Sequence, residues 1–134
     1  MTATIYAVPA FGKDFNGFLD FLHDQEIGVA ALSPKRFSEV FNMDLLTLAA
    51  QAHVHRNTIS RSPASESVQR FLREALRVIR AAADLSGEVN KALFWYHNEP
   101  LPPFGYKTAE QLVSDGRTED LLRYIESLEA GAAG

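Results

Sequence analysis

Apolar residues recur along this chain at the three- and four-residue spacing that is typical of an amphipathic α-helix. One stripe predicts a helix over 14–25, and a longer stripe predicts a helix that begins at Ser65 or Ser67 and ends at about Leu85. The core-facing positions of the longer helix are Val68, Leu72, Ala75, Ile79 and Ala82. Its opposite face carries Arg70, Arg73, Arg77 and Arg80, so this helix is expected to be two-sided.

Shorter helices are predicted between these two. Ser33 followed by Pro34 is an N-cap with proline at the first helical position, which predicts a short helix. Its buried face would be Phe37, Val40 and Phe41. Asn42 or Asp44 can open the next helix, whose inward positions are Leu45, Leu48, Ala49 and Ala52. A short break then leads into a helix over 56–61, which a Ser-Pro pair ends.

The last third of the chain predicts three more helices. Ser86-Gly87 interrupts the pattern, and a helix resumes over 89–97. The segment PLPPFGY that follows holds three prolines and a glycine, which predicts a rigid loop without regular structure. Thr108 with Gln111 forms a capping box for a helix through Val113. The final helix spans 118–129, and AGAAG follows it as a small-residue tail.

These elements predict an all-α fold. An extended arm over 3–13 comes first, the N-terminal helical domain spans 1–85, and a small second domain spans 86–134. The chain holds no cysteine, no apolar run long enough to span a bilayer and no visible secretion signal, so we expect a cytoplasmic protein. The sequence patterns of common enzyme and metal sites are missing as well, and we expect neither catalysis nor a bound cofactor or metal.

The stretch LAAQAHVHRNTISR, residues 48–61, has the pattern of a helix-turn-helix. Ala49 permits two helices to cross closely, and Leu48, Ala52, Val54 and Ile59 fall at the core offsets. His53 stands at the turn, where glycine is usual, although histidine tolerates the left-handed conformation better than most residues do. The motif would occupy about 44–62. The alternative is a helical corner whose polar face meets only water.

If the motif reads DNA, its outward residues would make the contacts. They are His55, Arg56, Asn57, Thr58, Ser60 and Arg61, all able to hydrogen-bond phosphates or base edges. The net charge is −4, but residues 55–80 hold six of the thirteen lysines and arginines with only two acidic residues. The arginines of the long helix could extend the DNA-binding surface or form a solvated face. Residues 110–134 are acidic, with six carboxylates against two arginines, and suit a basic partner.

Aromatic residues gather around the proline-rich loop. We expect Phe94 and Trp95 to lie in a satellite core that closes the C-terminal helices. Phe104 and Tyr106 lie on the stiff loop itself and are candidates for interface anchors, because aromatics on a rigid backbone lose little entropy on binding.

From about Ser33 onward the chain resembles the Xre/MbcA/ParS family of type II antitoxins. The resemblance rests on the helix-turn-helix stretch, Trp95 at a helix end, FGYKTAEQL after the proline loop, SDGRTEDLLRYIESLEAG, and termination shortly after Gly131. These pieces recur in this order in that family. Ala109 and His53 depart from the family's usual proline and usual turn residue.

The resemblance implies a partner, a RES-domain toxin that degrades NAD or transfers ADP-ribose to a protein. It further implies that the C-terminal domain covers the toxin's NAD cleft, with the tail 128–134 as a plug, and that the antitoxin forms a homodimer through its N-terminal domain and represses its own operon. The residues assigned to toxin binding are Phe104, Tyr106, Arg117, Tyr124, Leu128, Glu129, Ala130, Gly131, Ala132, Ala133 and Gly134. The alternative is a stand-alone transcriptional regulator whose C-terminal helices only dimerise.

Overall fold

The computed structural model describes residues 10–23 and 31–133, and it confirms the all-α fold class. Those residues form eight α-helices and one 3-10 turn, and none of them belongs to a β-strand. The elements are α1 Phe15–Leu22, α2 Pro34–Val40, α3 Leu45–Ala52, α4 Arg56–Arg61, α5 Glu66–Ser86, α6 Val89–Asn98, η1 Pro102–Phe104, α7 Ala109–Ser114 and α8 Thr118–Ala133. The arm predicted over 3–13 lies outside the described residues as far as position 9.

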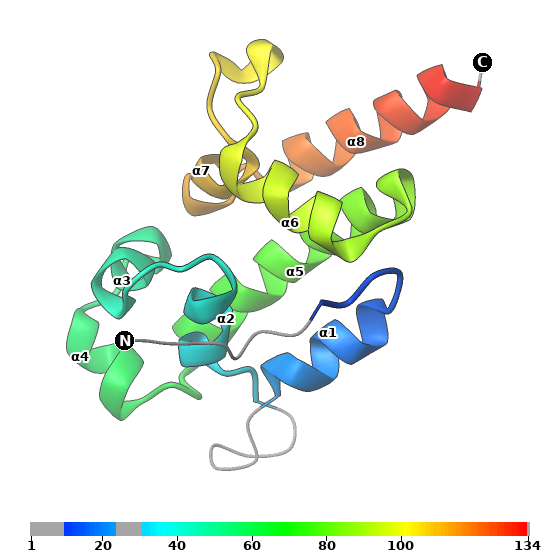
Figure 1. The fold of residues 1–134 in the computed structure, drawn as a ribbon. Helices are drawn as coiled ribbons and strands as arrows, with labels where there is room; N and C mark the ends of the chain where they lie inside the picture. Colours follow the sequence, from blue (N-terminus) through cyan, green and yellow to red (C-terminus); the bar gives the residue numbers. More distant parts are fainter. Residues whose placement is uncertain (1–9, 24–30, 134) are drawn as a thin grey trace.

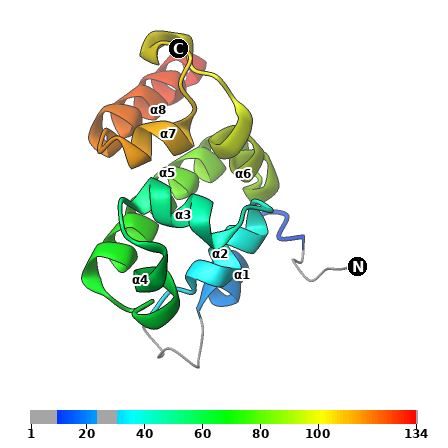
Figure 2. The same ribbon diagram turned by 90° about the vertical axis from the view of Figure 1, so that its left-hand side faces the viewer.

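Helix α5 is the axis of the molecule. Figures 1 and 2 show it running through the middle, with α1 to α4 on one side of it and α6 to α8 on the other. Its apolar face is buried from Val68 to Ala83, and all five positions predicted to face the core are buried. A single hydrophobic cluster runs from Phe11 to Ile125 through this face. Both groups of helices therefore share one core.

Most helix starts follow the predicted capping chemistry. The side chains of Asp14, Ser33, Asp44 and Thr108 each accept a hydrogen bond from a backbone N–H in the first turn. Asp44, rather than Asn42, opens α3, and Ser65 stands at the N-cap position of α5. The capping box of Thr108 and Gln111 is present with both of its bonds. Local side-chain chemistry thus sets where these helices begin.

The predicted first helix is too long at its C-terminal end. In the structure α1 ends at Leu22, and His23 is extended and forms an isolated β-bridge with Leu32. The carbonyls at this helix end are taken by residues that follow in sequence. The backbone N–H of Ser33 donates to Leu22 O at 2.7 Å, and the Arg36 guanidinium donates to Phe21 O at 2.8 Å. These donors, distant in sequence, satisfy the carbonyls at the helix end. The hydrophobic periodicity of 14–25 carries no information about them.

Two predictions in the last third are also wrong in detail. The loop PLPPFGY contains the turn η1, and its ends close as a bridge between Leu101 and Lys107, so it is more regular than expected. The segment AGAAG is not a separate tail, because α8 continues through Ala133. Alanine is the strongest helix former, and no proline stops the helix.

A buried amide ties three segments together. Gln69 is 7% exposed, and its side chain exchanges two hydrogen bonds of 2.9 Å with the backbone N–H and C=O of Leu32. Its amide nitrogen also donates to Pro63 O at 2.8 Å. Gln69 therefore holds the entry to α2 and the entry to α5 against the same turn of the axial helix.

Replacing this amide should destabilise the fold. Gln69→Met keeps the size of the side chain but leaves the N–H of Leu32 and two carbonyls without partners. We expect the free energy of unfolding to fall by about 3 kcal/mol, measured by urea denaturation. The control is Asp84→Ala on the exposed face of α5, which should change stability by less than about 0.5 kcal/mol. A Gln69→Met variant as stable as this control would contradict the role of the amide.

Candidate functional site

Helices α3 and α4 form a corner, and His53 lies at its turn. Leu48, Ala49 and Ile59 are buried. Between the helices His53 takes φ 58° and ψ 40°, the left-handed conformation expected of the residue at this turn. At the start of α3 the backbone N–H of Thr47 donates to Asp44, which lowers the pKa of that carboxyl. The two helices are thus joined by residues 53–55, of which His53 is left-handed.

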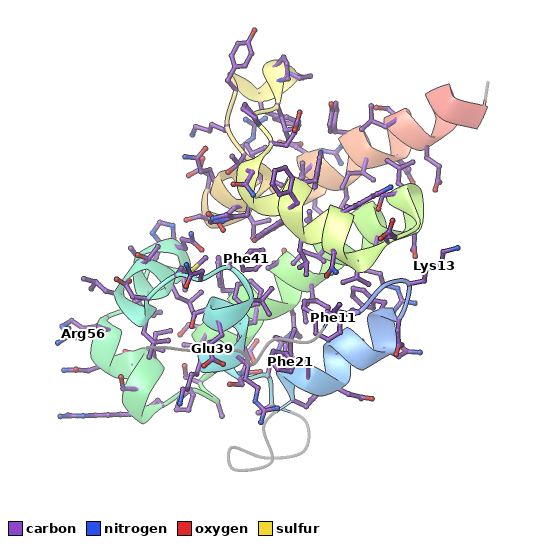
Figure 3. All side chains as sticks on the ribbon, viewed as in Figure 1. Phe11, Lys13, Phe21, Glu39, Phe41 and Arg56 are labelled. Atoms are coloured by element: carbon purple, nitrogen blue, oxygen red, sulfur yellow. The ribbon has the colours of Figure 1, made fainter. Side chains whose placement is uncertain are left out.

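Short helix α4 presents most of the residues predicted to contact DNA. His55, Arg56, Asn57, Ser60 and Arg61 are exposed, whereas Thr58 is half-buried. Figure 3 shows Arg56 pointing away from the body of the protein. Within the described part of the chain no carboxylate pairs with Arg56 or Arg61. Both guanidinium groups are therefore open to an anion.

His55 caps α4 with its ring. The backbone N–H of Asn57 donates to Nδ1 at 3.0 Å, so the neutral ring carries its proton on Nε2. This leaves one N–H donor on an exposed ring, and the local cap therefore fixes which ring atom a ligand could meet.

The arginines of α5 are engaged within the protein instead. Arg70 and Arg73 both lie near Glu66, at 3.9 and 2.8 Å. Arg77 pairs with Glu74 at 3.0 Å and with Glu119 of α8 at 2.8 Å. Its hydrogen bond to Glu119 is the main reason that the pKa of Arg77 is raised. Arg80 stacks over the Phe15 ring at 5.3 Å. This row links α5 to α8 and α1, and its charge is largely offset.

His53 has a role that the sequence did not reveal. Its Nε2 lies 2.7 Å from the carbonyl oxygen of Ser114, the last residue of α7. The hydroxyl of Ser114 donates to Gln51 O at 2.7 Å and lies 3.3 Å from the same ring nitrogen. We call this cluster of Gln51, His53 and Ser114 the α3–α7 latch. It accounts for a histidine at a glycine position, because glycine could not make the contact.

Three of the residues predicted to bind the toxin lie together where the proline loop meets α8. The rings of Phe104 and Tyr124 meet edge to face at 5.5 Å, and the Arg117 guanidinium lies 5.1 Å from the centre of the Phe104 ring. Asp120 accepts from Arg117 at 3.2 Å and from Arg123 at 2.6 Å, and these bonds lower its pKa. The result is a pre-formed stack of two rings and a cation, which we call the aromatic platform.

Tyr106 stands near the tip of the same loop and is 69% exposed. Its φ is +67°, an uncommon value for a bulky residue, and its N–H donates to Leu101 O at 3.0 Å. The loop therefore holds this ring in solvent on a constrained backbone.

The end of α8 holds the remaining predicted residues. Leu128 is 38% exposed, and Glu129, Ala130 and Gly131 are exposed and helical. Ala132 and Ala133 continue the helix, and Gly134 lies outside the described residues. Figure 1 shows this end extending beyond the neighbouring helices. At the start of this exposed helix end, Leu128 and half-buried Trp95 line a groove of about 100 Å³.

Helix α6 corrects one prediction and adds a buried polar group. Phe94 is 66% exposed instead of lying in a satellite core, because the buried face of α6 is Val89, Ala92 and Tyr96 and Phe94 points the opposite way.

The C-terminal half of α6 also contacts a buried carboxylate. His97 Nδ1 lies 2.7 Å from Oε2 of Glu110, which is 8% exposed. Burial raises the pKa of the Tyr96 phenol well above its usual value, and the charge of Glu110 adds to this shift.

Comparisons of the chain with protein-family models, with curated proteins and with solved structures find no match. None of the described helices combines the length and the apolar character needed to cross a membrane. Over 10–23 and 31–133, no three His, Asp or Glu side chains gather where they could share a metal ion.

The latch can be tested through the conformation of its histidine. His53→Ala removes the bond to Ser114 but keeps a Cβ in the left-handed turn, whereas His53→Gly removes the bond and relieves the turn. We expect the alanine variant to be less stable than the glycine variant by about 1 kcal/mol in urea unfolding. Amide hydrogen exchange at the end of α7 should be faster in both variants. Unchanged exchange in both variants would contradict the latch, whereas equal stability of the two variants would contradict strain at the left-handed turn.

Proposed function

We propose that this protein is an antitoxin that neutralises a RES-domain toxin by covering the toxin's NAD cleft with its C-terminal helices. The toxin would consume NAD or transfer ADP-ribose to a target protein. In this proposal the antitoxin is a cytoplasmic binding protein with no catalysis or cofactor of its own. The observation that carries the proposal is the end of α8, an exposed acidic helix that tapers to small residues beside the aromatic platform.

The distribution of charge supports this orientation. An NAD site must hold a doubly charged pyrophosphate, so its mouth should be basic. Within α8, Glu119 is paired with Arg77, and Asp120 with two arginines, which leaves these carboxylates already satisfied. Glu126 and Glu129 are exposed, and no cation of the described residues pairs with them. The negative charge left for a partner therefore lies at the proposed plug.

The helical form of residues 129–133 changes how such a plug would act. A helix is pre-ordered and presents a rod that is narrow where its residues are alanine and glycine. An ordered plug loses less conformational entropy on insertion than a flexible tail does. In this proposal the aromatic platform and Tyr106 dock on the toxin, and the end of α8 obstructs the cleft.

Truncation should separate these two roles. We expect deletion of 129–134 to restore NAD loss by the co-purified toxin, because the cleft is no longer obstructed, while pull-down of the toxin persists. The double variant Tyr106→Ala with Arg117→Ala should do the reverse, weakening pull-down while an excess of the protein still inhibits. NAD loss and capture are measured on the same samples. Full inhibition by the truncated protein would reject the plug.

A second activity, binding of operator DNA by a homodimer, is supported by the outward face of α4. Among the described residues no carboxylate pairs with Arg56 or Arg61, and exposed His55, which precedes Arg56, offers an N–H at Nε2. Because the arginines of α5 are paired internally, binding would depend on α4. The residues proposed to contact DNA are His55, Arg56, Asn57, Thr58, Ser60 and Arg61.

Single substitutions can test this face. Arg56→Ala and Arg61→Ala should each weaken operator binding. An arginine that contacts a base should cost about 1–3 kcal/mol, whereas loss of a phosphate contact should reduce the slope of log K against log salt concentration by about one. Arg70→Ala is the matched control, since it removes an arginine that already lies near Glu66. Binding measured by fluorescence anisotropy at several salt concentrations separates these outcomes. A loss as large in the control would show that only overall charge matters.

The alternative function is a stand-alone transcriptional regulator, favoured by the same α4 face. It predicts DNA binding without any toxic neighbour. An adjacent reading frame that encodes a toxic protein of similar size, and whose toxicity this chain relieves on co-expression, favours the antitoxin.

A further inference from the structure

The exposed aromatic side chain of α6 has no explanation within the fold. Phe94 is 66% exposed and is not packed against the hydrophobic core, although its neighbours Leu93 and Trp95 are. Phe94 forms part of the wall of a groove of about 340 Å³ between α2 and α6. Val40, Phe41 and Leu93 supply its apolar surface, and Figure 3 shows Phe41 lying between the two helices. A large apolar projection and an apolar groove thus occur on one face.

We propose that this α2–α6 face binds the same face of a second copy of the chain. In a two-fold symmetric pair each copy presents the same surface, so that surface must contain both the projection and the groove that receives it. The α2–α6 face meets this requirement, because Phe94 of each copy can enter the groove of the other and cover Val40 and Phe41. The projection and the groove are therefore complementary parts of one interface.

The charge of the face also favours its own copy over another partner. Three amides, Asn42, Asn90 and Asn98, line the groove, and among the described residues no Asp, Glu, Lys or Arg does. His97 also lines it, with Nδ1 bonded to Glu110. A surface that meets itself brings like charges together, so neutrality is required, and amides can donate to and accept from each other. The basic α4 face and the acidic end of α8 would repel themselves.

The sequence of α6 sets the register of the pair. If two α6 helices pack antiparallel with Phe94 near the two-fold axis, Asn90 of one copy faces Asn98 of the other. Each asparagine lies four residues, about 6 Å along the helix, from Phe94. Two copies of Asn90 would then be about 12 Å apart, too far for direct contact. The interface includes α6 and therefore differs from a dimer formed by the N-terminal domain alone.

This inference rests on the proposed function only in that both invoke a homodimer. None of the groove residues is among those proposed to contact DNA or the toxin. Toxin neutralisation could fail while the pair persists, and the reverse is also possible. The two proposals are therefore tested by different measurements.

The test is the oligomeric state of the purified full chain over micromolar to millimolar concentrations, by sedimentation velocity. We expect a monomer–dimer equilibrium. Phe94→Ala should raise the dimer dissociation constant about 100-fold, because each dimer loses two buried phenyl rings. Leu46→Ala is the matched control: it removes another exposed side chain, 59% exposed on α3, and should leave the equilibrium unchanged. Both positions are exposed, so folding should survive both changes.

The register is tested by cross-linking, which is clean because the chain has no cysteine. An equimolar mixture of Asn90→Cys and Asn98→Cys proteins should form the mixed disulfide much faster than either protein alone forms a disulfide with itself. A chain that stays monomeric throughout overturns both the pair and the homodimer. A dimer that Phe94→Ala leaves intact, or one without the mixed cross-link, overturns this face as the interface.

Discussion

The burial of one face of α5 is the constraint on which the rest of the structure depends. A helix this long is stable in water only when its apolar stripe is covered, and here helices from both ends of the chain cover it. The corner of α3 and α4 and the platform of Phe104 and Tyr124 are therefore positioned by the same rod. Polar contacts then set the details: Gln69 holds the early segments, and Arg77 joins the rod to α8. The apolar face brings the helices together, and the polar groups fix how they sit.

Much of this could be predicted from sequence, because it depends on neighbours along the chain. The stripe of α5, the caps at Ser33 and Thr108 and the left-handed turn at His53 are each written within a few residues. What could not be predicted depends on residues far apart. Helix α1 ends early because Ser33 and Arg36 take its carbonyls, and the partner of His53 is 61 residues away. The prediction that Phe94 lies in a satellite core is wrong because hydrophobicity alone does not show whether another element packs against a side chain.

The same limit applies to the candidate site. The sequence identified basic residues on α4 and α5 together, but only the geometry separates them. Over 10–23 and 31–133 no carboxylate holds Arg56 or Arg61, whereas the arginines of α5 are held by Glu66, Glu74, Glu119 and the Phe15 ring. Likewise the acidic residues of α8 near its start are paired, and those near its end have no partner among the described residues. Charge that a protein already satisfies internally adds little to the recognition of a partner, so a residue count overstates both surfaces.

The α3–α7 latch also bears on the order in which the molecule is made. During synthesis the chain emerges from its N-terminal end, so the α3–α4 corner is exposed well before Ser114 has been added. Until then His53 occupies an unfavourable backbone conformation without the hydrogen bond that compensates for it. The nascent corner is consequently less firmly held than the finished one, and it can lock only after Ser114 has been added and has folded against it.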